Sequence, residues 1–106
     1  MSPTIVNPAG LHDPVPFGDS HTATVPAGTE LVLVAGQYGS GPDGAVVAPD
    51  LNEQVRQAFH TLGVALAAHA VQGGCGANPP PQTVVGGAGL ARPDVLFEVE
   101  AVAVRP

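Results

Sequence analysis

Positive charge is scarce in this 106-residue sequence, which contains no lysine and only three basic residues, Arg56, Arg92 and Arg105. The formal net charge is −6. Proteins that bind nucleic acids neutralise phosphates with lysine and arginine, so this composition predicts no nucleic-acid partner. The same shortage disfavours adhesion to an anionic membrane, and no apolar stretch approaches the roughly 20 residues that span a bilayer.

Cysteine is almost absent as well, and the single Cys75 excludes an internal disulfide. The first residues, Met1 to Thr4, show neither the basic region nor the apolar region of a secretory signal peptide. We therefore expect a cytoplasmic protein. No pair of histidines has the spacing of zinc ligands, and we expect neither a metal ion nor an organic cofactor.

Large side chains are few, since tryptophan is absent and phenylalanine and tyrosine number 3 and 1, against 14 glycines and 12 prolines. The length suits a single domain over residues 1–106. Valine and alanine must fill most of its core in closely packed layers. Such a small domain would gain stability noticeably from oligomerisation.

Turn-forming residues divide the chain into short elements, beginning with a proline- and glycine-rich loop at 7–20. A glycine-rich linker is expected at 72–81. The apolar patterns predict four strands, at residues 21–25, 30–36, 82–87 and 96–104. We expect the first two strands to pair as a hairpin, because only a short turn separates them.

One amphipathic helix is expected from about Leu51 to His69. Asp50 is a good N-cap residue, with Glu53 three residues later. Apolar residues recur at helical spacing along one face: Leu51, Val55, Phe59, Leu62 and Leu66. Their burial outweighs Gly63, which weakens a helix by about 1 kcal/mol relative to alanine. The sequence thus predicts an α+β fold with the helix packed on one face of the sheet.

Two carboxylates interrupt the apolar pattern of the last strand. Alternation places Glu98 and Glu100 on one face and Phe97 and Val99 on the other. Side chains two apart on a strand lie roughly 6.5 to 7 Å apart, so the two glutamates are close neighbours. Two interpretations are open: a pair of carboxylates that works as a general acid, or two glutamates on a solvated face.

Three blocks of the sequence together resemble the Rid family of reactive-intermediate deaminases, also called the YjgF or L-PSP endoribonuclease family. The blocks are residues 33–37, 53–58, and 80–83 followed by 97–104. The resemblance implies a chorismate-mutase-like fold with a mixed sheet, a homotrimer, and ligand clefts between subunits. Members of the family hydrolyse enamines and imines to ketoacids and ammonia without a cofactor.

The resemblance assigns Glu98 to the family's glutamate, as the catalytic acid or base of the cleft. The family's arginine, which grips the substrate carboxylate, is replaced by Gln82. Because charge-assisted hydrogen bonds are roughly twice as strong as neutral ones, this replacement predicts a weaker hold on a carboxylate. The sequence therefore looks like an arginine-lacking subgroup of the family.

Four further residues are expected to bind substrate on the same resemblance: Phe17, His21, Ala35 and Gly36. Phe17 stands where tyrosine is usual and Ala35 where serine is usual, so two polar contacts are missing. For His21 the alternative is a hydrogen-bonded structural histidine. A nucleophilic triad with its neighbours Asp19 and Ser20 is disfavoured, because adjacent strand residues point in opposite directions.

The resemblance also implies a length difference, since family members carry about 20 more residues, one strand and one helix, before the proline pair. Either the chain is shortened or this sequence omits a segment. The leading hypothesis is a Rid-like protein that binds a small metabolite between subunits, with weak or altered enamine/imine deaminase (hydrolase) activity. The alternative is a non-catalytic regulatory or interaction protein with a vestigial cleft.

Overall fold

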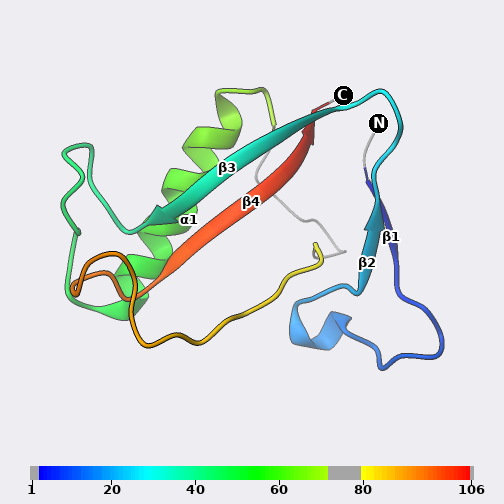
Figure 1. The fold of residues 1–106 in the computed structure, drawn as a ribbon, viewed down its shortest axis with the longest axis horizontal. Coiled ribbons are helices and arrows are strands. Elements are labelled where there is room, and N and C mark those ends of the chain that lie inside the picture. Colours follow the sequence, from blue (N-terminus) through cyan, green and yellow to red (C-terminus); the bar gives the residue numbers. More distant parts are fainter. Residues whose placement is uncertain (1–2, 72–79, 106) are drawn as a thin grey trace.

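The structure, a computed structural model, describes residues 3–71 and 80–105. Its elements are, in chain order, β1 (Thr4–Val6), the 3-10 helix η1 (Val15–Phe17), β2 (Thr22–Thr24), β3 (Glu30–Tyr38), α1 (Leu51–Ala67) and β4 (Glu98–Arg105). In Figure 1, α1 lies against the long β3–β4 pair, while β1 and β2 form a second pair to one side. Cys75 and most of the expected 72–81 linker lie outside the described residues.

The strand pairing corrects the expected hairpin. β1 pairs antiparallel with β2, and β3 pairs antiparallel with β4, so the strands on either side of the turn at 26–29 belong to different sheets. β3 is nine residues long and β4 eight, whereas β2 has only three residues. The long apolar strand therefore pairs with the distant strand that matches its length rather than with its neighbour in sequence.

The strand expected at 82–87 is also wrong. Pro81 makes an isolated parallel bridge with Ser20, and residues 82–87 continue as an irregular segment. Val84 and Val85 are exposed. Their β-branched side chains favour a strand, but within the described chain no partner strand or buried face stabilises one.

The helix begins where the sequence predicts. The Asp50 side chain accepts a hydrogen bond of 3.1 Å from the Glu53 backbone N–H, which satisfies one of the donors at the first turn. α1 ends at Ala67, two residues before the expected His69. The cap is confirmed. The predicted apolar stripe is only partly buried, since Leu66 is buried but Leu51 and Phe59 are exposed, and the other buried residues of α1 are Gln54 and Ala58.

Packing of α1 against the sheet leaves a small core. Among the described residues, the buried apolar side chains are Val32, Ala58, Leu66 and Val95. The Cα radius of gyration is 15.2 Å, larger than the about 13 Å of a compact 100-residue domain. Isolated two-stranded sheets are marginal in water. The single chain thus has little internal packing for its length.

The β3–β4 sheet has one face against α1 and one exposed face. The Phe97 ring lies 5.9 Å from the Phe59 ring of α1, which places the odd-numbered residues of β4 toward the helix. The opposite face, here called the outer face, carries Leu31 and Leu33 of β3 and exposed residues of β4. The exposed residues of β4 on this face are Glu98, Glu100 and Val102. The predicted division of β4 into two faces is confirmed.

A β-bulge interrupts the register of the β3–β4 pair. Val34 is opposite Ala101 and Gln37 is opposite Val99, so β3 holds one more residue than β4 between these pairs. Side chains beyond the bulge are shifted by one position relative to those before it. Tyr38 consequently lies on the outer face.

Candidate functional site

Glu98 lies at the start of β4, directly opposite Tyr38 in the ladder. Its carboxyl group lies over Gly36 in the bulge, where a Cβ atom would approach the Glu98 Cδ to 2.7 Å. Real Cβ atoms almost never come so close to another heavy atom. The missing side chain at Gly36 therefore makes room for the carboxylate, and exposed Ala35 lies next to it in β3. We call Ala35, Gly36 and Glu98 the bulge group.

The remaining expected site residues lie beside η1. Gln82 donates twice to this region, from its backbone N–H to Asp19 Oδ1 at 2.8 Å and from Nε2 to the Gly18 carbonyl at 2.7 Å. These two bonds hold the segment after Pro81 against the loop that follows η1. The side-chain amide of Gln82 is thus engaged within the chain rather than directed at Glu98.

His21 joins a small aromatic cluster at the same place. Its Nε2–H donates to the His12 carbonyl at 2.8 Å, and its backbone N–H donates to Asn7 Oδ1 at 2.7 Å. The His12 ring meets the His21 ring edge-on at 4.8 Å and the exposed Phe17 ring at 5.9 Å. His12 was not expected here, because a loop residue without periodicity gives no sequence signal.

The structure therefore divides the expected site residues into two groups. One is the bulge group; the other, called the η1 group, consists of Phe17, His21 and Gln82. Among the described residues, none of the hydrogen bonds joins the two groups. In Figure 1 the starting end of β4 and the β1–β2 pair lie on opposite sides of the molecule. A single chain thus presents the two halves of the expected site in different places.

A cation lies over the ring of Tyr38, the ladder partner of Glu98. The Arg92 guanidinium lies 5.0 Å from the centroid of the Tyr38 ring, within the range of a cation–π contact. Arg92 Nη2 and the Tyr38 hydroxyl both donate to the Gly44 carbonyl, at 3.1 and 2.7 Å. The sequence offered no signal for this cluster beyond the rarity of arginine.

Arg92 also forms a loose ion pair. Its Nε lies 3.8 Å from Asp94 Oδ1, and the two side chains are 46% and 61% exposed. Exposed pairs of this kind contribute about 0 to 1 kcal/mol. Asp94 is therefore a weak partner that another anion can replace at little cost.

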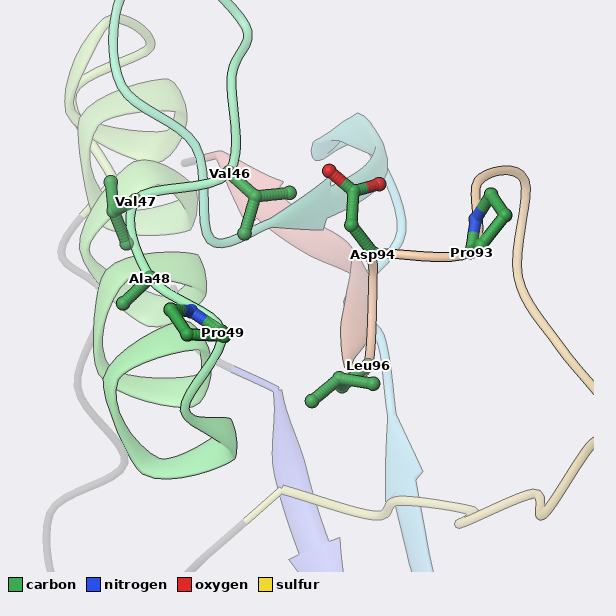
Figure 2. A pocket seen from close by; sticks show the side chains of 7 residues that line it. All are labelled: Val46, Val47, Ala48, Pro49, Pro93, Asp94 and Leu96. Carbon is green, nitrogen blue, oxygen red and sulfur yellow. The ribbon is translucent and has the colours of Figure 1, made fainter.

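Two surface depressions lie apart from both groups. One, of about 460 Å³, has walls from residues 46–49, Pro93 and Leu96, and Asp94 is its charged residue. In Figure 2 the Asp94 carboxylate stands between Val46 and Pro93. The other, of about 420 Å³, lies between α1 and the chain around Gln37. Neither depression is lined by Glu98 or Gln82, so within the described residues these two hollows do not coincide with the expected catalytic and binding side chains.

Metal-binding clusters and membrane-spanning helices are both absent from residues 3–71 and 80–105. No cluster of three or more histidine, cysteine, aspartate or glutamate side chains in this part of the chain is arranged to hold a metal ion. No helix in the same residues has the length and apolar character required to cross a membrane.

Comparison with known proteins gives one informative match. No protein-family model and no curated protein matches the sequence. Among solved structures, the chain resembles YyfB from Yersinia pestis, described as a protein of unknown function of the conserved Rid protein family, with a TM-score of 0.89 and 26% sequence identity. The match covers 97% of this chain and 98% of that one. Over nearly its whole length the chain is therefore similar to a member of the Rid family, in agreement with the three sequence blocks.

Proposed function

We propose that the chain, as a single cytoplasmic domain, binds a small metabolite in a cleft between the subunits of a homotrimer and slowly hydrolyses its enamine or imine group. The observation that carries this proposal is the position of Glu98. Its carboxylate is exposed on the outer face and occupies the space that Gly36 leaves open. Exposure makes the carboxylate accessible to a ligand, and the close fit over Gly36 limits where it can lie.

A single carboxylate is sufficient for the proton transfers of this hydrolysis. Glu98 accepts a proton from water as the water oxygen bonds to the C=N carbon, and it returns a proton to the nitrogen. Glu98 then takes the remaining hydroxyl proton of the adduct and passes it to the nitrogen as the C–N bond breaks and the C=O bond forms, so that one water is consumed and a carbonyl product and ammonia are released. Because the Gln82 amide is engaged with Gly18 and carries no charge, we expect turnover to be slow.

The first test measures ammonia released from 2-aminoacrylate that a pyridoxal-phosphate lyase generates in the same vessel. We expect a small acceleration over the spontaneous reaction, which Glu98→Gln abolishes, because general acid–base groups contribute about 10² to 10⁴ in rate. Gly36→Ala should also lower the rate of ammonia release, since the added Cβ displaces the Glu98 carboxyl group. Glu100→Gln, a neutralisation two residues away on the same face, is the matched control.

Two results would contradict these assignments. Acceleration that survives Glu98→Gln would remove Glu98 from the reaction. Rapid turnover that Glu98→Gln abolishes would show that the missing arginine at position 82 does not matter.

The homotrimer is supported by the apolar character of the outer face. Leu33 and its ladder partner Val102 are 73% and 69% exposed, in a chain whose own core is small. Association through this face would bury these side chains. It would also allow the η1 group of one subunit to meet the bulge group of another. A chorismate-mutase-like arrangement is part of this proposal, and the near-complete overlap with a Rid-family chain supports a Rid-like fold. The proposal also includes a shortening by about one strand and one helix, although the matched Rid-family chain has nearly the same length as this one.

The proposed trimer predicts that Leu33→Asp will dissociate the protein. Each buried leucine contributes roughly 1.5 to 3 kcal/mol, and an unpaired carboxylate opposes burial further. Light scattering after size-exclusion chromatography should give three chain masses for the wild type and one for the variant. Val64→Asp, at an exposed position of α1, should remain trimeric. A wild-type protein that is monomeric throughout would contradict the proposed assembly.

The second candidate function is a non-catalytic regulatory or interaction protein. It is favoured by the two depressions, which lie away from both Glu98 and Gln82. Thermal unfolding with small metabolites separates the candidates, because a ligand that binds only the native state raises the melting temperature. Under the first proposal, Gln82→Ala erases the rise in melting temperature that the ligand causes. If the protein instead binds the ligand with neither the bulge group nor the η1 group, the variant keeps this rise.

A further inference from the structure

The three arginines of this chain differ in their surroundings. Arg56 pairs with Glu53 on the same side of α1, and Arg105 pairs with Glu30 at the end of the β3–β4 ladder. Both are ordinary surface ion pairs. Arg92 instead lies over the ring of Tyr38, whose ladder partner is Glu98.

Tyr38 links Arg92 to Glu98. The ring lies beneath the guanidinium, and Tyr38 is the ladder partner of Glu98. Directly opposed residues of an antiparallel pair have Cβ atoms about 4.5 to 5.5 Å apart. The guanidinium thus contacts the ring of the tyrosine that lies opposite Glu98, so Arg92 and Glu98 belong to the same end of the sheet.

The contacts of Arg92 fix its position and leave binding capacity. Nη2 donates to the Gly44 carbonyl, which also receives the Tyr38 hydroxyl. Within the described chain, Nη1 has no hydrogen bond, and the 3.8 Å between Nε and Asp94 exceeds hydrogen-bond length. A guanidinium presents its donors as a planar fork that matches the two oxygens of a carboxylate.

We propose that Arg92 binds the carboxylate of a small ligand whose reacting carbon faces Glu98, so that Asp94 is displaced from Arg92 when the ligand binds. This inference rests on the proposed function and adds to it the residue that selects carboxylate-bearing ligands. The chain has a net charge of −6 and therefore attracts no anions as a whole. A local cation therefore favours carboxylate binding, and position 82 does not supply one.

The experiment titrates pyruvate into the ¹⁵N-labelled oligomer and follows amide chemical shifts. The wild type should bind pyruvate, and Arg92→Gln should weaken binding about tenfold or more, because a charge-assisted bond is lost. Arg92→Lys should bind with intermediate strength, since it keeps the charge and loses the fork. Asp94→Asn should bind more tightly, because it removes the competing anion. Arg105→Gln, an equal loss of charge far along the ladder, should match the wild type.

The outcomes separate this inference from the proposed function. If Arg92→Gln and Arg105→Gln bind pyruvate with equal affinity and both give native-like spectra, the proposed role of Arg92 is overturned. The same conclusion follows if pyruvate causes no change in the amide chemical shifts of the wild type. If ammonia release still depends on Glu98 in either case, the proposed function stands. If pyruvate binding depends on Arg92 but ammonia release does not depend on Glu98, the proposed function fails and the carboxylate site remains.

Discussion

Gln54→Leu should lower the free energy of unfolding by at least about 3 kcal/mol, because three backbone groups lose their hydrogen-bond partner at about 1 to 3 kcal/mol each. Gln54 is fully buried on α1. Its Nε2 donates to the carbonyls of Ala48 and Asp94 at 2.9 and 3.0 Å, and its Oε1 accepts from the Leu96 N–H at 2.9 Å. Leucine fills a similar volume but satisfies none of these groups.

Urea denaturation measures this loss, with Gln57→Leu as the matched control. Gln57 makes a single side-chain bond, to the Ser40 carbonyl at 2.9 Å, so its replacement should cost about 1 kcal/mol. Gln54→Glu should also be strongly destabilised, since it removes the donor and sets a carboxylate oxygen against two carbonyls. Equal effects of Gln54→Leu and Gln57→Leu would show that the three bonds do not act together.

Gly39→Ala should destabilise the protein by about 3 kcal/mol, at the upper end of the cost of overpacking a core. A Cβ on Gly39 would lie 2.6 Å from the Gln54 Cα and 2.7 Å from its carbonyl oxygen. These are backbone atoms in the first turns of α1, so the clash moves the helix rather than a flexible side chain. The contact of β3 with α1 depends on this glycine.

Gly63→Ala is the control for Gly39→Ala and should have the opposite sign. Gly63 lies within α1, and a Cβ there meets no atom within 4 Å. Alanine in a helix interior is favoured over glycine by about 1 kcal/mol. Thermal unfolding should therefore show a lower melting temperature for Gly39→Ala and a higher one for Gly63→Ala. If the Gly39→Ala protein is as stable as the wild type, the close approach of Gly39 to the Gln54 backbone is contradicted.

Local signals in the sequence were sufficient to predict α1 and the two faces of β4. The Asp50 cap and the apolar periodicity depend only on nearby residues, and so does the alternation around Glu98. The β3–β4 pairing joins distant residues across the length of the chain, and no local pattern encodes it. The strand expected at 82–87 failed for the same reason, because its existence depended on a partner.

The candidate site was predictable only as separate residues. The resemblance selected Glu98 and Gly36, and the structure shows them in contact range at the bulge. It also selected Gln82, whose engagement with Asp19 and Gly18 depends on contacts more than 60 residues apart. Arg92 went unnoticed because its placement depends on Tyr38 and on the Gly44 turn, neither of which a motif describes.

The bulge in β3 makes the location of the site depend on strand length as well as on residue type. If β3 kept the same residues but paired with β4 without a bulge, Gln37 rather than Tyr38 would lie opposite Glu98. Tyr38 would then turn toward α1 and Gly39 toward solvent, so the ring beneath Arg92 and the close helix contact would be lost together. Deletion of one bulge residue, by contrast, would leave Tyr38 opposite Glu98 and keep both surfaces, because it removes the residue of β3 that has no counterpart in β4.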